Sequence, residues 1–583
     1  MLQSVRFKAL AGIFSLIVII FAAEQFFHKP SNISIPDQCV SCHNNIKNVG
    51  KSHRISVFGC ATCHKGNRYA TNKRDAHKGI IANPAGLDFA EASCGKCHAE
   101  LVKDVKNSIM NTNEGIINDT NFQLGFTSEP FGKLTIDDLR HADTQNDFAV
   151  KYYRKMCGAC HINQNQKIFK KYSFLTRGGG CVDCHAIKRK GGRCVSLTTH
   201  IPDKNCLKCH NRSGRIGLAY YGHFESAGLI SNPGGLSSHK IAKENRYWYK
   251  LHADIHQKDG LSCIDCHTSV GIMGNGSHYK RMWDQVDISC IDCHKPKFAP
   301  PDTLAKKLIF LNGKLPEAKL VAYTNRFHTD LYNVQKRDGK VYFYFKKTGK
   351  RVLMPIMKDK KYHTLPFHSR LSCQACHSSW SQSCYGCHVA YFKKGRQYDW
   401  LSHKVTSGSF SEFNSFYRHS IVLGISYNGK IMPFVPGCQT FVTKYFGTTI
   451  KQFHKLTFAP IAPHTTMSNS RSCAECHINP VTLGLGRGTL YIKNGKMDFF
   501  PVYQSKASGL PINHPLDALE NISGKAFTQM ALPNERPFNK SELKRIIFSW
   551  RCIICHDKYS DKIYTDYKKS VALFNEGLTK CSR

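Results

Sequence analysis

The sequence predicts a mainly α-helical chain with much irregular loop structure and a few small β-hairpins in its C-terminal half. Three observations predict this class. The pentapeptide Cys-x-x-Cys-His occurs twelve times in 583 residues, and its copies follow no fixed period, so the chain is not a simple tandem duplication. Eight copies crowd into the first 294 residues. Three segments of the sparser second half carry hairpin signals among mostly short helices and loops.

Each copy of the pentapeptide is a signature for covalent attachment of a c-type haem. Two thiols at this spacing match the two vinyl groups of one haem, and the adjacent histidine is its proximal iron ligand. The sequence therefore predicts twelve covalently bound c-type haems, each with its iron. The attachment cysteines and proximal histidines, numbered here as motifs 1 to 12, are Cys39/Cys42/His43, Cys60/Cys63/His64, Cys94/Cys97/His98, Cys157/Cys160/His161, Cys181/Cys184/His185, Cys206/Cys209/His210, Cys263/Cys266/His267, Cys290/Cys293/His294, Cys373/Cys376/His377, Cys384/Cys387/His388, Cys473/Cys476/His477 and Cys552/Cys555/His556.

This signal is far above chance. With 27 Cys and 30 His in the chain, random shuffling would give on the order of 0.06 copies. Zinc sites and redox disulfides also use Cys-x-x-Cys, but neither requires a histidine directly after the second cysteine. Three cysteines lie outside the motifs, and for them a disulfide between Cys194 and Cys438 in an oxidising compartment and a set of unpaired thiols that includes Cys581 remain equal alternatives.

The N-terminus predicts export. Arg6 and Lys8 precede an apolar run from Ala9 to Ala23, as in a secretory signal. The run extends to Phe27, so its 19 residues would span about 28 Å as a helix, close to the hydrocarbon thickness of a bilayer. We favour an uncleaved anchor over a cleaved signal. The rest of the chain is expected on the periplasmic side of the cytoplasmic membrane, with an extracellular location as the alternative.

The charge is strongly basic, formally +41 from 82 Lys and Arg against 41 Asp and Glu. Such an excess first suggests nucleic acid or an anionic membrane as a partner. Twelve haems, however, would bring about 24 propionates, which leaves about +17 in the reduced protein. We therefore expect much of the basic excess to pair with propionates and expect no nucleic-acid binding.

The motifs divide the chain into haem-rich and haem-free stretches. The first half is expected to be a dense series of haems, and the second half to carry fewer haems on more polypeptide. The predicted divisions are 1–28 (signal or anchor helix), 29–98 (haems 1–3), 99–156 (haem-free connection), 157–294 (haems 4–8), 295–372 (haem-free insert with a β-hairpin) and 373–583 (haems 9–12 with haem-free β-containing stretches).

Three hairpins are expected in the second half. Strand-forming residues 341–345 lead to a turn near Thr348-Gly349. The dipeptides Asn428-Gly429 and Asn494-Gly495 are each flanked by apolar residues and are typical of tight hairpin turns. We favour a role for these hairpins in covering haem edges over a role in binding a partner or shaping a substrate site.

Histidines outside the motifs are candidate distal iron ligands. Leaving aside His28 beside the apolar run, 17 such histidines face 12 irons, so ligation of every iron by two histidines is the expected state. Several stand just before a motif, and His252 and His256 would share one face of a helix. The preferred twelve are His53, His77, His141, His200, His239, His252, His256, His278, His368, His403, His419 and His464, with His223, His328, His363, His454 and His514 in reserve.

The repeated motif, the export segment and the histidines ahead of motifs resemble the large multihaem cytochrome c superfamily. Residues 206–217 (CLKCHNRSGRIG) and 462–466 (APHTT) look like segments of large exported cytochromes from anaerobic metal- or sulfur-metabolising bacteria. The resemblance implies a fold built around stacked, mostly bis-histidine haems and electron transport in anaerobic respiration or extracellular electron transfer. It implies redox protein partners: a quinol-oxidising complex as donor, and an outer-membrane conduit or a terminal reductase as acceptor.

Enzymatic relatives provide the alternative function. Pentahaem nitrite reductases carry a Cys-x-x-Cys-Lys that this chain lacks, whereas hydroxylamine-oxidoreductase-like octahaem proteins keep Cys-x-x-Cys-His at a haem without a distal ligand. Octahaem sulfite reductases use a wider cysteine spacing. Membrane-anchored quinol dehydrogenases would suit the nearness of Cys39 to the apolar run, although the rest of that resemblance is missing.

The alternative is therefore an oxidoreductase that converts a small nitrogen or sulfur compound at one five-coordinate haem. Its candidate polar groups are Arg370, Tyr385, Arg418 and His419. The preferred expectation is an electron-transfer protein without catalytic residues. A third alternative is a subunit of a conducting filament.

Overall fold

The structure is a computed structural model, and the fold is described for residues 37–46, 48–141, 148–164, 177–187, 195–211, 216–226, 238–240, 247–357, 363, 365–419, 421–446, 449–493, 496–502, 517–527, 529–530, 532–558 and 560–579. The expected anchor, residues 1–28, lies outside these ranges. Within them, no helix combines the length and the apolar composition that crossing a bilayer requires.

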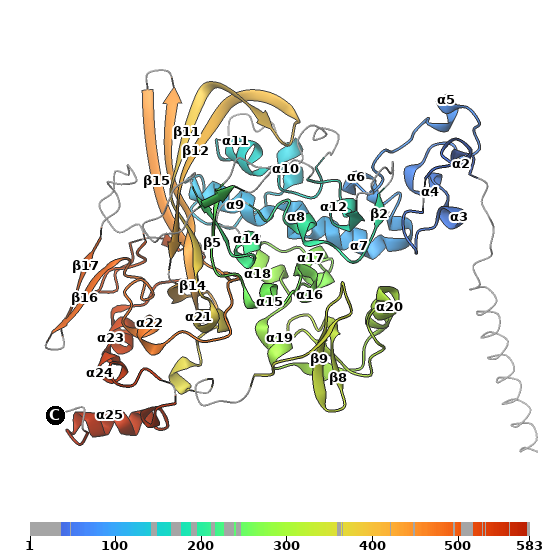
Figure 1. Ribbon diagram of the computed structural model, residues 1–583. Coiled ribbons are helices and arrows are strands. Elements are labelled where there is room, and N and C mark those ends of the chain that lie inside the picture. Colours follow the sequence, from blue (N-terminus) through green and yellow to red (C-terminus); the bar gives the residue numbers. More distant parts are fainter. Residues whose placement is uncertain are drawn as a thin grey trace, which may run out of the picture. The chain divides into compact units, whose positions relative to one another are not determined.

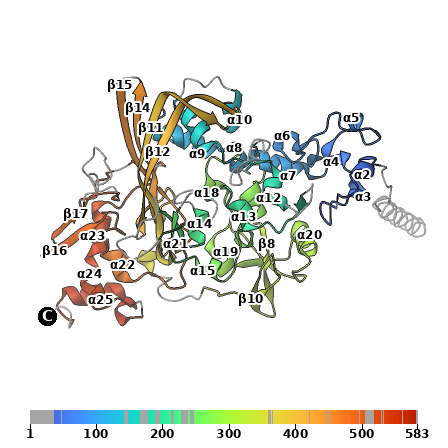
Figure 2. The ribbon, with the colours of Figure 1, turned by 45° about the horizontal axis from the view of Figure 1, so that its top comes forward.

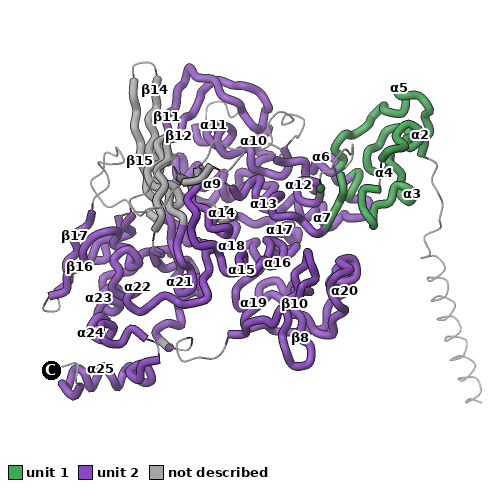
Figure 3. The backbone as a smooth tube through the Cα atoms, in the orientation of Figure 1, with its two compact units in different colours: residues 1–84, 92–94, 186–198 green, residues 85–91, 95–185, 199–583 purple. Residues whose placement is uncertain are grey.

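The chain divides into two compact units (Figure 3). Unit 1 comprises residues 1–84, 92–94 and 186–198, and unit 2 comprises residues 85–91, 95–185 and 199–583. Unit 1 contains short helices and one two-stranded antiparallel sheet: α2 (Cys39–Cys42), α3 (Ile55–Phe58), α4 (Ala61–His64), α5 (Lys73–Ala76), β1 (Ala186–Ile187) and β2 (Ser196–Leu197).

The first part of unit 2 is a succession of short helices with one small sheet (Figures 1 and 2). Helix α7, the longest among the described residues, bends at His98, whose backbone leaves the helical range. The small sheet has the order β3-β5-β4. The elements are α6 (Leu87–Ala90), α7 (Gly95–Asn107), α8 (Ile109–Thr112), α9 (Glu114–Gln123), α10 (Ile136–His141), α11 (Phe148–Tyr152), the π-helix η1 (Tyr153–Cys157), α12 (Cys181–His185), α13 (Asp203–Cys206), α14 (Ile216–Tyr220), β3 (His223–Ser226), β4 (Ser238–Lys240), β5 (Tyr247–Lys250), α15 (Ile255–Lys258), α16 (Cys263–Cys266), α17 (Ser269–Met273), α18 (Met282–Gln285) and α19 (Cys290–His294).

The predicted haem-free insert folds as a five-stranded antiparallel sheet with one helix. The strand order is β10-β9-β8-β7-β6, from β6 (Lys297–Ala299), β7 (Val321–Tyr323), β8 (Asp330–Arg337), β9 (Lys340–Tyr344) and β10 (Arg351–Leu353). Ile309 of α20 (Thr303–Asn312) packs in one core cluster with Val321 and Tyr344. A second cluster around Leu331 packs against Cys293 of motif 8. The insert is therefore joined through its core to a haem attachment motif.

A larger sheet with long strands follows the insert. Its order is β12-β11-β14-β15-β18, with β13 paired to β14 (Figure 1). Before it come the 3₁₀ turn η5 (Pro366–His368) and α21 (Cys373–His377). The strands are β11 (Ser381–Asp399), β12 (Lys404–His419), β13 (Val422–Ile425), β14 (Ile431–Phe446), β15 (Thr449–Pro460) and β18 (Gln529–Met530). Phe434 and Phe458, on paired strands, are almost fully buried.

The C-terminal part returns to short helices around one hairpin. Ile421, Leu483, Leu543 and Ile547 form the centre of its core. The elements are α22 (Cys473–His477), β16 (Gly488–Lys493), β17 (Lys496–Pro501), α23 (Lys540–Phe548), α24 (Trp550–Ile553), the 3₁₀ turn η6 (Lys562–Tyr564) and α25 (Tyr567–Asn575).

The predicted mainly α class is wrong, because the described residues form five β-sheets besides the helices and the fold is mixed α/β. The three predicted hairpins are present as β9–β10, β13–β14 and β16–β17. The error lies in β11, β12, β14 and β15. Their sequences are rich in aromatic and β-branched residues that favour strands, but the nearby haem motifs led to an expectation of short helices.

Truncation of a core side chain in the insert should destabilise it. Leu331 is 2% exposed, so Leu331→Ala should cost about 2–5 kcal/mol. Leu304→Ala on α20 is the matched control: its side chain is 54% exposed, and the same deletion there should cost less than about 0.5 kcal/mol. Thermal unfolding and limited proteolysis measure both. Equal effects of the two variants would contradict this packing of the sheet.

Candidate haem centres

Eleven of the twelve motifs contain a helical turn. Their cysteines lie at or beside α2, α4, α7, η1, α12, α13, α16, α19, α21, α22 and α24. Residues three apart on a helix share one face, so a turn brings the two sulfurs of a motif to the same side. This local geometry suits two thioether bonds to the edge of one macrocycle.

Side-chain caps hold several of these turns in place. Ser262 and Asp265 form a capping box around α16, and the Ser262 amide donates to Asp265 Oδ2 at 2.8 Å. Ser289 with Asp292, and Ser472 with Glu475, repeat this arrangement at α19 and α22. The pattern Ser-Cys-x-(Asp/Glu)-Cys-His is visible in the sequence as a capping box, but sequence reasoning overlooked it.

The caps also connect motifs to their surroundings. Asp265 Oδ1 accepts the Lys346 amide at 2.8 Å, and Asp292 Oδ1 accepts the Asn325 amide at 3.0 Å. Motifs 7 and 8 are thereby bonded to the haem-free insert. In unit 1, the Asp37 carboxylate accepts the backbone amides of Cys39 and Cys60, so one side chain caps motifs 1 and 2 together. Asp37 is a second capping residue that sequence reasoning missed.

The predicted iron ligands do not form clusters. Within the described part of the chain, no three histidine, cysteine or acidic side chains are grouped closely enough to hold a metal ion by themselves. A haem iron takes four of its ligands from the macrocycle and only one or two from the protein. A predicted haem centre therefore requires a pair of histidines at most, and not a cluster of three ligands.

Four motif histidines face a histidine from elsewhere in the chain. The ring centroids are 6.1 Å apart for His43 and His77, 6.1 Å for His256 and His294, 6.2 Å for His267 and His464, and 6.1 Å for His368 and His477. The first pair lies within unit 1 and the other three lie within unit 2.

This spacing matches two imidazoles on one iron. A metal bound at about 2.0 Å by one nitrogen of each ring would set the centroids about 6.3 Å apart, because each nitrogen lies about 1.15 Å from its ring centre. The His267 and His464 rings are also nearly parallel, at 6°. Four of the preferred distal residues, His77, His256, His368 and His464, therefore stand where a second axial ligand would stand.

Hydrogen bonds orient several of these rings. Nδ1 of His294 donates to Pro355 O at 2.8 Å, that of His464 donates to Ala462 O at 2.9 Å, and that of His256 donates to Asp254 Oδ1 at 2.8 Å. His64 donates in the same way to Ile81 O at 2.9 Å. Such bonds fix the tautomer and leave Nε2 as the nitrogen available to a metal.

Burial keeps several of the paired rings neutral. Burial lowers the pKa of His267 to about 4, with a further contribution from the charge of His464. Burial likewise lowers the pKa of His368 to about 4. Neutral imidazole is the form that binds a metal, so these surroundings suit a ligand role.

Motif 4 shows a related arrangement. Its His161 is 1% exposed, and neither ring nitrogen has a hydrogen-bond partner among the described residues. Burial lowers its pKa to about 3, and the charges of Arg140 and His403 add to the effect. The His403 backbone is left-handed, with φ of 57°, as is that of His464 with φ of 56°. Strained backbone at both proposed distal ligands is typical of functional positions.

Several predicted attachment residues are less enclosed than these centres. Cys97 of motif 3 and Cys555 of motif 12 are exposed, whereas Cys63 of motif 2 and Cys94 of motif 3 are half-buried. The polypeptide around motifs 3 and 12 thus encloses their second cysteine little, whereas in motif 11 the first cysteine, Cys473, is buried and the second, Cys476, is half-buried. The haem-attachment role of these four cysteines stays a prediction from the motif.

His210, the predicted proximal ligand of motif 6, is also exposed. Its amide donates to the Cys206 carbonyl at 3.1 Å, so it closes the turn that carries the motif cysteines. It lies close enough to His267 of motif 7 for its charge to lower the pKa of that ring. The structure therefore places His210 beside a facing pair, and its own role as an iron ligand stays a prediction.

His556, the predicted proximal ligand of motif 12, has an acidic partner. Its Nδ1 lies 3.3 Å from Asp561 Oδ2, and its backbone carbonyl accepts the Tyr564 hydroxyl. A carboxylate at Nδ1 leaves Nε2 as the nitrogen available to a metal, as at His256. These contacts orient the ring in a way that suits a ligand, although the role itself stays a prediction.

The other preferred distal histidines have different surroundings. His53 lies 6.0 Å from the Phe58 ring, Nε2 of His252 contacts Lys258 Nζ at 2.6 Å, and Nδ1 of His278 lies 2.9 Å from Glu114 Oε2. His200 has a pKa lowered by burial and is hydrogen-bonded to Asn312. The side chains of His141, His239 and His419 lie outside the described residues.

Two of the reserve histidines are informative. His363 lies close enough to His377 of motif 9 for its charge to lower the pKa of that ring, which makes it a better candidate there than its reserve place suggested. His328 stacks on Tyr323 at 5.4 Å. His223 has a pKa lowered by burial, whereas the side chains of His454 and His514 lie outside the described residues.

The motifs of unit 2 touch one another in a series. The thiols of Cys160 and Cys209, of Cys206 and Cys263, and of Cys290 and Cys373 are hydrogen-bonded, and these contacts join motifs 4 and 6, 6 and 7, and 8 and 9. Cys184 of motif 5 is close to Cys206, Cys266 of motif 7 to Cys293, and Cys376 of motif 9 to Cys476. Tyr564 is hydrogen-bonded to Cys473 of motif 11 and lies near Cys552 of motif 12.

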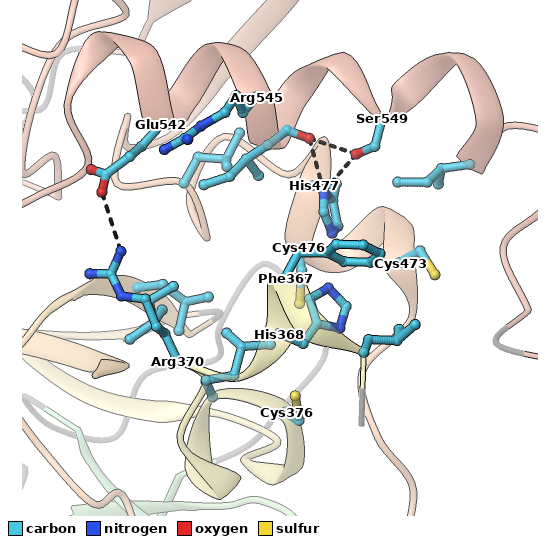
Figure 4. Close-up of a pocket in the computed structure, with 18 of the residues that line it drawn as sticks. Phe367, His368, Arg370, Cys376, Cys473, Cys476, His477, Glu542, Arg545 and Ser549 are labelled. Carbon is cyan, nitrogen blue, oxygen red and sulfur yellow. Dashed lines mark hydrogen bonds and ion pairs between the residues drawn. The ribbon is translucent and has the colours of Figure 1, made fainter. Parts of the chain in front are cut away.

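A cavity of about 420 Å³ marks the centre of motif 11 (Figure 4). His368 and His477 face one another in it, and Cys473 and Cys476 line it. The volume lies in the range of cofactor sites, about 300–1,000 Å³. Cys376 and Cys552 also line the cavity, so motifs 9 and 12 border it.

The rim of this cavity is charged. Arg370 and Arg545 line it, and Arg370 Nη1 lies 3.5 Å from Glu542 Oε1. Guanidinium groups are the usual partners of carboxylates such as haem propionates. The residues present therefore fit a c-type haem: two facing imidazoles, two thiols on one helical turn, apolar walls and cations at the rim.

Motif 10 differs from the other motifs because it lies in a strand. Cys384 pairs with Phe416 of β12, and Cys387 pairs with Thr440 of β14, with a register shift between Tyr385 and His388. The candidate catalytic residues Tyr385, Arg418 and His419 belong to the same strand pair, but their side chains lie outside the described residues. So do those of Cys384, Cys387 and His388, and of Cys194, Cys438 and Cys581.

Removal of one proposed distal ligand should change a single haem. His464→Ala should convert one six-coordinate, low-spin ferric haem into a five-coordinate or water-bound high-spin haem, because the iron beside His267 loses its second imidazole. Electron paramagnetic resonance of the oxidised protein measures this change. His328→Ala is the matched control, since His328 shares the left-handed backbone (φ of 56°) but stacks on Tyr323. An unchanged spectrum for His464→Ala would contradict the pairing.

No family model matches the chain, and neither the curated proteins nor the solved structures contain a match to it.

Proposed function

We propose that this protein is a multihaem c-type cytochrome that carries electrons along a series of covalently bound haems. The observation that supports this best is the set of four facing histidine pairs at 6.1–6.2 Å. Two imidazoles on one iron fill both axial positions. Such an iron has no open site for a substrate and changes only its oxidation state.

The contacts between motifs supply the path. In unit 2 the series runs from motifs 4 and 5 through motif 6 to motifs 7, 8, 9, 11 and 12, by the thiol contacts described above. Motif 6 is a branch point, because it contacts motifs 4, 5 and 7. Haems attached to touching motifs are close neighbours, which is the condition for electron exchange between them.

The proposed setting is the periplasmic side of the cytoplasmic membrane or the cell exterior, in anaerobic respiration or extracellular electron transfer. The export-type N-terminus and the haem motifs favour that side, because c-type haems are attached outside the cytoplasm. We propose a quinol-oxidising complex as donor, and an outer-membrane conduit or terminal reductase as acceptor. The basic charge of +41 exceeds what about 24 propionates would neutralise, which favours acidic docking partners.

Haem content and axial ligation test this function together. The purified protein should contain twelve haems per chain by pyridine haemochrome assay and intact mass. Its ferric haems should be low-spin, and its ferrous form should not bind carbon monoxide. A high-spin haem that binds carbon monoxide, together with turnover of hydroxylamine or sulfite, would instead establish the oxidoreductase alternative.

Loss of one haem from the middle of the series should divide the path. A Cys290→Ala, Cys293→Ala double variant removes both attachment points of haem 8, which connects motifs 7 and 9. Conductance through single molecules held at the two ends of unit 2 should fall at least about tenfold, as a barrier increase of about 1.4 kcal/mol would give. The corresponding variant of motif 5, Cys181→Ala with Cys184→Ala, lies on a branch and should leave the conductance nearly unchanged. Equal losses in both variants would contradict the proposed order.

A further inference from the structure

A buried carboxyl lies near the centre of motif 11. Glu520 is 0% exposed, and neither carboxyl oxygen forms a hydrogen bond of normal geometry within the described residues. Gly484 lies beside this carboxyl, since a Cβ built on it would be in van der Waals contact with Oε1, at 3.6 Å. An ionised carboxylate without a partner is very costly in such surroundings, so the group is held as the neutral acid.

The charges around Glu520 come from two neighbouring segments. Arg536 donates to both oxygens of Glu542 on α23, at 2.6 and 3.0 Å, and Arg370 lies 3.5 Å from the same carboxylate. The hydrogen bond from Arg536 lowers the pKa of Glu542 to about 2. Burial raises the pKa of Glu520 to about 9; the charge of Glu542 raises it further, while the Phe538 amide and Arg536 lower it. On the segment of Glu520 itself, Asp517 is paired with Arg487 at 2.9 Å.

These two glutamates therefore have opposite protonation states at neutral pH. Glu542 is the ionised member, and its charge is compensated by two arginines. Glu520 is the protonated member and is the one whose state can change near neutral or alkaline pH. Neighbouring titratable groups with opposite pKa shifts are a common feature of sites that move protons.

This network is connected to the iron site through α23. The ring nitrogen Nδ1 of His477 donates to Ile546 O at 2.9 Å and lies 2.7 Å from Ser549 Oγ, both in the last turn of the helix or directly after it. Glu542, in the first turn of the same helix, lines the cavity between His368 and His477 (Figure 4). A change of charge at the iron acts on these groups through a poorly screened interior.

We propose that Glu520 releases its proton when the haem between His368 and His477 is oxidised and binds a proton again when that haem is reduced, so that this centre couples electron and proton transfer. The inference rests on the proposed function. Reduction by a neighbouring ferrous haem converts Fe(III) to Fe(II) and oxidises that neighbour to Fe(III). The positive charge near the cavity falls by one, and the Glu520 carboxylate binds one proton. When this iron is reoxidised, its electron passes to the next haem and Glu520 releases the proton.

The test is a spectroscopic redox titration of the whole haem-loaded protein at a series of pH values. The ferric iron lowers the pKa of Glu520 relative to the ferrous state, so the coupling should be seen between about pH 7 and pH 10. In that window the midpoint potential of one haem component should fall as pH rises, because reduction then requires uptake of a proton. A midpoint independent of pH for every component would overturn the proposal.

Two variants assign the effect. Glu520→Gln keeps the shape of the side chain but cannot ionise, so the component should lose its pH dependence. Glu317→Gln, at an exposed glutamate of the insert, should behave as the unmodified protein. A Glu520→Gln protein that keeps the pH dependence would contradict the proposal. If Glu520→Gln lowers the yield of folded protein, Glu520→Asp decides: the pH window should move, and an unmoved window overturns the assignment.

The haem assay distinguishes failure of this inference from failure of the proposed function. Protein that contains no covalent haem would refute the proposed function. Protein with twelve low-spin haems and no pH-dependent component would leave the function in place and refute the role of Glu520 alone.

Discussion

The arrangement of the molecule depends on pairs of imidazoles brought together from separate segments. In the sequence, strands β11 to β15 separate His267 from His464 and His368 from His477. Each pair stands at a distance that one iron would span. In the proposed holoprotein, a metal–ligand bond at each pair joins two distant segments, and a thioether-bound macrocycle fills the space that side chains fill in an ordinary core. Haem binding and folding are then one process.

The same constraint is the reason that we propose conduction rather than catalysis. A second histidine at an iron removes the open position that substrate chemistry needs, and the caps and Nδ1 bonds around the paired rings keep that histidine in place. Contacts between motifs then decide where an electron can go next. Near motif 11, helix α23 also connects the iron site to a buried acid. Its Ile546 carbonyl accepts the hydrogen bond from His477, and its Glu542 neighbours Glu520.

The mixed α/β fold was not predicted from the sequence, whereas the spacing of the motifs predicts haem attachment, because two thiols and a histidine within five positions have few other uses. That attachment stays a prediction. The order of histidines along the chain also led to His77, His256, His368 and His464, which the structure places opposite motif histidines. The position of His363 near His377 was not predictable, because the intervening loop determines it. The capping boxes were also visible in the sequence, because a serine precedes the motif and an acidic residue stands at its third position. This pattern was not used. The long strands β11, β12, β14 and β15 were missed although their residues favour strands, because the nearby motifs led to an expectation of short helices.

The most direct test of the central claim is the location of the irons in the haem-loaded protein. Anomalous diffraction at the iron absorption edge gives these positions independently of the fold. The account predicts an iron midway between the rings of each facing pair, with a nitrogen of each ring at about 2.0 Å. An iron bound to the motif histidine of any of these pairs but not to the facing histidine would contradict it.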